Sequence, residues 1–218
     1  MRAIGEAGYV MTGDPDPKLC KAMAMAITGD VGAGKSTVSG ILKSKGWALI
    51  DADKVVADLW RTPGVINEAV KRWGEGILED GAVVRARVAA TIFNDRTEYN
   101  WTMSLLHPLV KKEMTLRVEA LKKEGKPIAA EIQMLFEAGV APWVTAKTFV
   151  TASRDTRLKR CLARGWDEAE MSRRESFFMS SEERMALSDF VIRNDGTLDD
   201  LRKTIGKIVD GGQWAFKK

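Results

Sequence analysis

The stretch AMAMAITGDVGAGKST, residues 22–37, joins a short apolar run to a glycine-rich loop that ends in Lys-Ser-Thr. Residues 29–36 fit the pattern G-x-x-x-x-G-K-[ST], which is typical of loops that bind phosphate groups. Glycines let such a loop curve until its N–H groups point at phosphate oxygens, and the following helix adds its positive N-terminal end. The apolar run at 22–28 indicates a buried strand, and apolar residues recur at helical spacing over 35–45. The stretch therefore predicts a strand, a phosphate-binding loop and a helix.

The chemistry of this loop indicates a nucleoside triphosphate. Lys35 is expected to reach the β- and γ-phosphates, and the Ser36 hydroxyl is expected to ligate Mg²⁺. The guanine-reading motif Asn-Lys-x-Asp is absent, because none of the four asparagines is followed by lysine. We therefore predict ATP and Mg²⁺ as cofactors. The loop residues expected to contact the nucleotide are Gly32, Ala33, Gly34, Lys35, Ser36 and Thr37.

Composition limits the class of protein. The chain has 218 residues, of which 45% are apolar and 29% are charged, and its net charge of +4 is too small to indicate nucleic acid. Cys20 and Cys161 lie far apart without metal-binding spacing, and His107 is the only histidine, which excludes a multi-histidine metal site. We find no signal peptide and no apolar run of membrane-spanning length. We therefore expect a cytoplasmic protein without a membrane or nucleic acid partner.

Strand and helix patterns alternate along the chain. Buried strands are predicted at residues 22–28, 47–53, 127–135, 147–153 and 189–192. This alternation predicts an α/β fold of three layers, in which helices cover both faces of a five-stranded parallel sheet. The helical block at 54–126 is too long for a simple crossover, so we expect an inserted helical subdomain. The predicted division is an N-terminal extension of unknown role at 1–21, a nucleotide-binding core at 22–53, 127–157 and 185–218, the subdomain at 54–126, and a basic helical segment at 158–184.

Two carboxylates end the second predicted strand, in the segment DAD at residues 51–53. A carboxylate at the C-terminal end of a strand beside a phosphate loop faces the ligand crevice. Asp53 is therefore a candidate base for an attacking hydroxyl, and Asp51 would lie nearer the metal or cap the next helix. The alternative is that both residues only cap that helix, where aspartate is common.

Other charged residues fit the same chemistry. Arg157, Lys159, Arg160 and Arg164 lie close together on a predicted helix, and arginines stabilise the charge of a phosphoryl group in transfer. The alternative is a solvated basic face. Glu131 lies in an otherwise apolar strand, where we expect it to hold Mg²⁺, and the alternative is a strand-end residue that reaches solvent.

Seven segments along the chain resemble the dephospho-coenzyme A kinase family, and the resemblance covers about residues 24–205. The segments that carry the resemblance are ITGDVGAGKSTV, LIDADKVV, DGAVVRARVAATIF, LLHPLVKKEM, EIQMLFEAG, RLKRCLARG and RMALSDFVIRNDGTLDDL. The family transfers the γ-phosphate of ATP to the ribose 3′-hydroxyl of dephospho-coenzyme A, which gives coenzyme A and ADP. The resemblance therefore implies the last step of coenzyme A biosynthesis, with dephospho-coenzyme A as the partner.

The resemblance also implies roles by position. Asp53 would be the base for the 3′-hydroxyl, and Lys35 and Arg160 would stabilise the transferred group. Arg164 would act from a lid at 158–184, and Asn194 in RNDG would meet the adenine of ATP.

On the acceptor side, the resemblance implies that the subdomain at 54–126 binds dephospho-coenzyme A through Arg85 and His107. A purely structural role for His107, which precedes Pro108, is the alternative.

Several positions depart from the family pattern. Asp30 stands in place of a usual glycine, and we expect its side chain to point outward from the phosphate loop. Gln133 replaces a usual proline, and Val84 stands where an acid is common. Phe178 and Ser181 replace a usual glutamine and arginine near the lid. The arginines expected to compensate for these last two changes are Arg173, Arg174 and Arg184.

Two rival functions remain compatible with the residues. One is another phosphate-loop kinase that acts on a nucleoside monophosphate or a small metabolite. The other is an ATP-binding switch without transfer activity, or an ATPase associated with nucleic acid. The carboxylates at 51 and 53 disfavour a switch, because a switch needs no base for an acceptor hydroxyl.

Overall fold

The computed structural model describes residues 9–11 and 23–210. The chain divides into two compact units, one formed by Met1–Ile50 with Arg117–Lys218 and the other by Asp51–Leu116. Cys20 and most of the predicted N-terminal extension lie outside the described residues. None of the helices in the described ranges has enough length and apolar character to span a bilayer.

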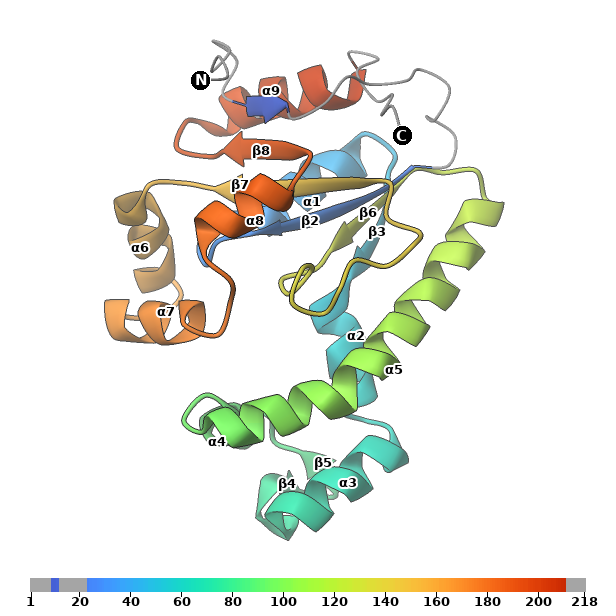
Figure 1. The fold of residues 1–218 in the computed structure, drawn as a ribbon, viewed down its shortest axis with the longest axis vertical. Helices are drawn as coiled ribbons and strands as arrows, with labels where there is room; N and C mark the ends of the chain where they lie inside the picture. Colours follow the sequence, from blue (N-terminus) through green and yellow to red (C-terminus); the bar gives the residue numbers. More distant parts are fainter. Residues whose placement is uncertain (1–8, 12–22, 211–218) are drawn as a thin grey trace. The chain divides into compact units, whose positions relative to one another are not determined.

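The first unit is built on a six-stranded sheet in the order β1-β8-β7-β2-β6-β3 (Figure 1). Five of its strands are parallel, which confirms the predicted sheet. The sixth, β1, pairs antiparallel with β8 at one edge, and no sequence pattern predicted this strand. The bounds are β1 Tyr9–Met11, β2 Ala24–Gly29, β3 Ala48–Asp51, β6 Ile128–Glu131, β7 Ala146–Thr151 and β8 Phe190–Arg193.

Strand β2 lies between β6 and β7 in the middle of the sheet. All six of its residues are buried, as expected for a parallel strand with neighbours on both sides. The register pairs Ile27 with both Glu131 of β6 and Thr148 of β7. The carboxyl ends of these strands therefore meet at one edge, where the glycine loop begins.

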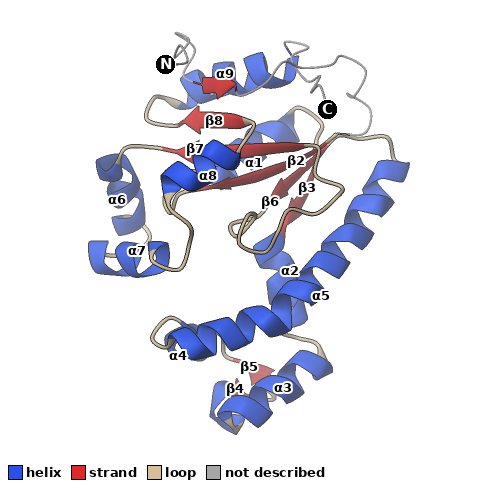
Figure 2. Ribbon diagram, viewed as in Figure 1, coloured by secondary structure: helices blue, strands red, loops and turns tan. Residues whose placement is uncertain are grey.

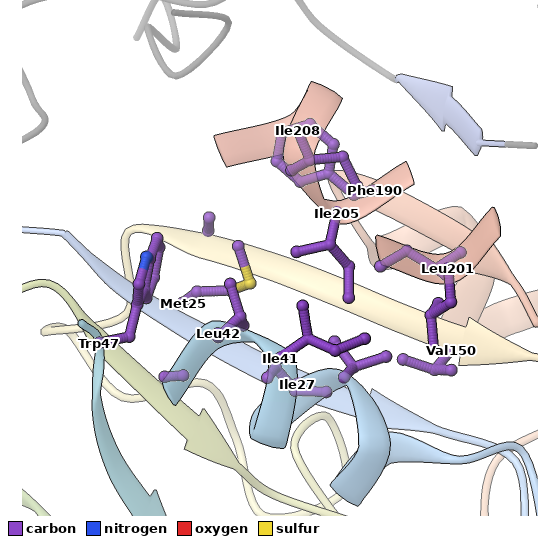
Figure 3. Packing of buried hydrophobic residues seen from close by; sticks show 14 of the residues in the cluster. Met25, Ile27, Ile41, Leu42, Trp47, Val150, Phe190, Leu201, Ile205 and Ile208 are labelled. Atoms are coloured by element: carbon purple, nitrogen blue, oxygen red, sulfur yellow. The ribbon is translucent and has the colours of Figure 1, made fainter. Parts of the chain in front are cut away.

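Helices cover both faces of this sheet. Figure 3 shows Ile41 and Leu42 of α1 and Ile205 of α9 packed with Ile27 and Val150 of the strands in one apolar cluster. Helix α8 lies on the other side of the sheet from α1 (Figure 1). The predicted three layers are confirmed. The helices of this unit are α1 Lys35–Ser44, α6 Arg154–Leu162, α7 Glu168–Glu175, α8 Ser181–Leu187 and α9 Leu198–Asp210, and α5 Arg96–Lys123 enters it at its C-terminal end.

The second unit is mainly helical, with one short hairpin (Figure 2). Its own core contains Trp60, Val65, Ala69, Ile77, Val88 and Leu106. Glu98 of α5 joins this helix to α3, because its carboxylate accepts hydrogen bonds from Arg72 and from the indole of Trp73. These hydrogen bonds, first that from Arg72, hold the pKa of Glu98 below its ordinary value. The elements are α2 Ala52–Leu59, α3 Pro63–Trp73, the 3-10 turn Glu75–Ile77, β4 Leu78–Glu79, β5 Ala82–Val83, α4 Arg85–Ile92 and most of α5.

Candidate nucleotide-binding site

The loop between β2 and α1 has a conformation that requires its glycines. Gly34 precedes α1 with a φ of 95°, in the left-handed region that favours glycine. A Cβ atom on Gly34 would lie 2.5 Å from Nδ2 of Asn194, and one on Gly29 would lie 2.1 Å from the carbonyl oxygen of Val150. The neighbouring strand and the loop after β8 therefore leave no room for side chains at these two positions.

The carbonyl groups of the loop accept hydrogen bonds from Lys35 at its end and from two residues distant in sequence, Arg160 and Asn194. Nζ of Lys35 donates to the carbonyl oxygens of Gly29 at 3.3 Å and Asp30 at 3.0 Å. The carbonyl of Ala33 accepts from Nη1 of Arg160 at 3.1 Å and from Nδ2 of Asn194 at 2.8 Å. Because the first N–H groups of a helix have no intrahelical partner, the N-terminus of α1 is available to an anion at this loop.

Arg160 and Asn194 both donate to the loop, although they are far from it in the sequence. Nη2 of Arg160 also donates to the carbonyl oxygen of Asn194 at 2.9 Å, so α6 and the loop after β8 are joined there. Ser36 and Thr37 are exposed in the first turn of α1, and Arg164 is exposed just beyond α6. The structure thus brings Arg160 and Asn194 together at the backbone of the phosphate loop.

The loop after β8 is fixed to the start of α6 by a carboxylate. Oδ1 of Asp195 accepts from the backbone N–H of Ser153, the N-cap residue of α6, at 2.7 Å. Partial burial would raise the pKa of Asp195, but hydrogen bonds from Ser153 and Thr156 hold it below its ordinary value. Asn194 therefore stands beside an ionised, hydrogen-bonded neighbour.

Glu131 is the last residue of β6 and is partly buried. Its Oε2 accepts a hydrogen bond from Oγ of Ser39 at 3.0 Å. Ser36 and Ser39 are three residues apart on α1 and share one face, so Glu131 lies beside the face that carries Ser36. Among the described residues, no three His, Cys, Asp or Glu side chains gather as a metal cage. Magnesium sites in phosphoryl-transfer enzymes need only one or two carboxylates beside the substrate phosphates, so Ser36 and Glu131 fit such an ion.

The two carboxylates of the segment at 51–53 lie at the end of β3 and in the first turn of α2. Asp51 is the N-cap of α2, and its Oδ1 accepts from the backbone N–H groups of Asp53 at 2.9 Å and Lys54 at 3.2 Å. Asp53 lies in the first turn of α2 with an exposed side chain. The capping role that the sequence left open for both residues therefore belongs to Asp51.

The residues predicted for the acceptor lie in the second unit. Arg85 is exposed in the first turn of α4, and His107 is partly buried in the middle of α5, before Pro108. A proline inside a helix removes a backbone N–H donor, which favours a local bend there.

Asp30 does not point outward from the loop, contrary to the sequence-based expectation. It is only 2% exposed, and its carboxylate accepts from Thr151, Ser181 and Arg184. Burial lowers the pKa of Arg184 from its ordinary value, whereas nearby carboxylates, first Asp30, raise it. The contacts of Asp30 with Thr151 and Arg184 were not predicted from the sequence. The signal in the sequence was Asp30 itself, because an acid in a phosphate-binding loop requires a cationic partner.

Two arginines of the predicted lid, Arg173 and Arg174, form ion pairs with Glu170 of the same segment. Burial would raise the pKa of Glu170, but hydrogen bonds from Arg173 and Arg174 hold it below its ordinary value. Arg157 forms an ion pair with Glu175 and donates to the carbonyl oxygen of Val31 at 3.3 Å. Arg157 thus connects α6 and α7 to the phosphate loop.

The chain is similar to known proteins over most of its length. A family model for dephospho-CoA kinase matches residues 23–200. The dephospho-CoA kinase of Helicobacter pylori is 33% identical over 189 residues, which cover 85% of this chain and 95% of the relative. That of Carboxydothermus hydrogenoformans is 34% identical over 195 residues, which cover 87% and 94%.

Solved structures show the same fold. The crystal structure of TT1252 from Thermus thermophilus has a TM-score of 0.71 at 28% identity and covers 87% of this chain and 97% of its own. Dephospho-CoA kinase from Campylobacter jejuni has a TM-score of 0.63 at 21% identity, with coverages of 87% and 96%.

Proposed function

Because the chain belongs to the dephospho-CoA kinase family, we propose that it transfers the γ-phosphate of ATP to the ribose 3′-hydroxyl of dephospho-coenzyme A. The products are coenzyme A and ADP. The observation that carries the proposal is the glycine loop before α1, with Lys35 in the first turn and Arg160 on its carbonyl groups. Such a loop supplies N–H donors and positive charge to a triphosphate before any reaction begins.

The cationic groups have distinct tasks in this proposal. Lys35, at the positive end of α1, turns from the loop carbonyls toward the β- and γ-phosphates. Arg160 stabilises the charge that spreads over the oxygens of the phosphoryl group in transfer, and Arg164 approaches the same group from the lid at 158–184. Asn194, which is already fixed to Ala33, orients the adenine end of ATP.

Asp53 accepts the proton of the 3′-hydroxyl in this mechanism. Two observations support this role. Asp51 already caps α2, so Asp53 is not required as the cap, and the side chain of Asp53 is exposed just after the strand β3. A base that orients the hydroxyl and takes its proton lets the oxygen attack the γ-phosphorus in line.

Mg²⁺ would be held by the hydroxyl of Ser36 and the carboxylate of Glu131, both of which are oxygen ligands of the kind this ion prefers. When bound, the ion neutralises charge on the phosphate oxygens. Ser39 keeps Glu131 oriented through its hydrogen bond at 3.0 Å.

The helical unit is the proposed acceptor site. Arg85 and His107 of the predicted subdomain at 54–126 would contact dephospho-coenzyme A, and Arg85 is exposed at the start of α4, as such a contact requires. We propose the cytoplasm as the location and no nucleic acid partner.

Phosphate transfer by the purified protein tests the function. With Mg²⁺ and ATP, we expect ADP release that depends on dephospho-coenzyme A, and coenzyme A as the product by mass spectrometry. Nucleoside monophosphates serve as competing acceptors. Faster ADP release with one of these acceptors than with dephospho-coenzyme A would replace the proposed substrate, and no release with any acceptor would reject transfer.

Glu131→Gln is expected to lower the affinity for Mg²⁺ rather than abolish activity. The amide keeps the size of the side chain but removes the charge, so the Mg²⁺ concentration for half-maximal rate should rise about 10- to 100-fold. A magnesium titration at fixed ATP measures this shift. Glu124→Gln, on an exposed glutamate paired with Lys126, is the matched control and should leave the titration unchanged. Identical titration curves for Glu131→Gln and the wild type would exclude Glu131 from the metal site.

A further inference from the structure

The phosphate loop contains a buried carboxylate whose partners come from other elements. The Asp30 side chain, 3% exposed, follows the first glycine of the loop. Its Oδ2 accepts from Oγ1 of Thr151 on β7 at 2.6 Å. Its Oδ1 accepts from Oγ of Ser181 at 2.5 Å and from Nη2 of Arg184 at 3.1 Å, both on α8. Burying a carboxylate costs free energy unless the group is paired and hydrogen-bonded. These donors therefore allow an aspartate to be buried in this loop.

The side chain of Arg184 is buried and lies against two aromatic rings. Its side chain is only 2% exposed. The guanidinium lies 5.1 Å from the ring centre of Phe149 and 5.5 Å from that of Phe178, within the range of attractive cation–π contacts. At the start of α8, Ser180 and Glu183 form a capping box that fixes the helix end near Asp30.

Arg184 also reaches the backbone of the loop. Its Nη1 donates to the carbonyl oxygen of Gly29 at 3.4 Å. The same carbonyl accepts from Nζ of Lys35 at 3.3 Å and from Nε2 of Gln133 at 3.0 Å. Arg184 and the phosphate-binding lysine therefore share one acceptor, so a change at Arg184 is expected to alter the surroundings of Lys35.

We propose that Arg184, assisted by Ser181, is a positioning residue for the phosphate loop. It neutralises Asp30 next to the triphosphate and holds the Gly29 carbonyl in place. The inference rests on the proposed function in one respect, namely that ATP binds at this loop. Without the cation, the carboxylate would repel the phosphates, because unscreened charges interact strongly where water is excluded.

Direct binding of ATP separates this inference from the transfer reaction. In calorimetric titrations with Mg²⁺, Arg184→Met should raise the dissociation constant for ATP at least about tenfold. The double variant Asp30→Asn/Arg184→Met, which also removes the negative charge, should return the constant to within about threefold of the wild type. Arg184→Lys, which keeps the charge, should bind ATP more tightly than Arg184→Met. At saturating ATP, the KM for dephospho-coenzyme A should stay within about threefold, because no group proposed to bind the acceptor is changed.

An exposed pair provides the control. Asp199 and Arg202 form an ion pair at 2.8 Å on the surface of α9, and Asp199→Asn/Arg202→Met should leave ATP binding unchanged, as expected for exposed pairs. Arg184→Met that binds ATP like the wild type would overturn the inference, as would a double variant no better than Arg184→Met.

Two further outcomes are also decisive. If Arg184→Met does not fold, recovery of a folded, ATP-binding protein in the double variant supports the inference, and its failure to fold overturns it. A wild-type protein that does not bind ATP would overturn the proposed function itself, whereas normal ATP binding without transfer to dephospho-coenzyme A would leave the role of Arg184 intact.

Discussion

Asp53→Asn is expected to lower kcat for phosphate transfer to dephospho-coenzyme A by about 100- to 10,000-fold, the usual contribution of a positioned base. Asparagine has nearly the same size but cannot take the proton of the 3′-hydroxyl. Helix α2 should persist, because its cap is Asp51. ADP release at saturating substrates measures kcat, and calorimetry should show ATP affinity within about threefold of the wild type.

Asp58→Asn is the matched control for this change. Asp58 lies on the same helix, is exposed, and forms an ion pair with Arg61 at 3.3 Å. It should retain wild-type kcat. An Asp53→Asn protein with undiminished kcat would remove Asp53 from the mechanism, and equal losses in both variants would indicate damage to α2 instead of loss of a base.

Lys35→Ala is expected to lower kcat by about 100- to 1,000-fold, the usual effect of removing one group that stabilises the transition state. It should also weaken ATP binding, because Lys35 is expected to contact the phosphates before and during transfer. Alanine favours helices, so the first turn of α1 should remain. Single-turnover measurements, with enzyme in excess over ATP, separate the rate of transfer from the affinity for ATP.

Lys43→Ala tests whether any lysine on this helix has the same effect. Lys43 is exposed in the last turn of α1, far along the helix from the glycine loop. We expect wild-type kinetics for this variant. A Lys35→Ala protein as active as Lys43→Ala would show that the loop binds phosphate without its lysine.

Much of the fold follows from local sequence patterns. Apolar runs and the glycine loop predicted the five parallel strands, because buried parallel strands are continuously apolar. The hairpin of β4 and β5 was missed, although Asp80-Gly81 is a strong turn signal. Strand β6 ends at Glu131 rather than at the predicted 135, and turns follow it. Glu131 is therefore the last residue of its strand and does not lie in the middle of the strand, contrary to the prediction.

The sequence predicted site residues only where they follow one another in a single motif. Lys35 and Ser36 follow from the loop pattern itself, whereas the pairing of Asp30 with Arg184 joins residues 154 positions apart. No periodicity identifies which of many arginines meets a given carboxylate, because that choice depends on how α8 packs on the sheet. The acid in the loop was visible in the sequence, but its partner was not.

The three residues Tyr9–Met11 complete the edge of the main sheet by pairing with β8. Strand β8 leads directly into Asn194, which donates to the phosphate loop. Removal of the N-terminal segment would leave the main-chain groups of β8 unpaired on that side, and unpaired edges promote association between molecules. Shortened versions of this chain that begin after residue 11 should therefore be judged by their tendency to aggregate before any loss of activity is assigned to the nucleotide site.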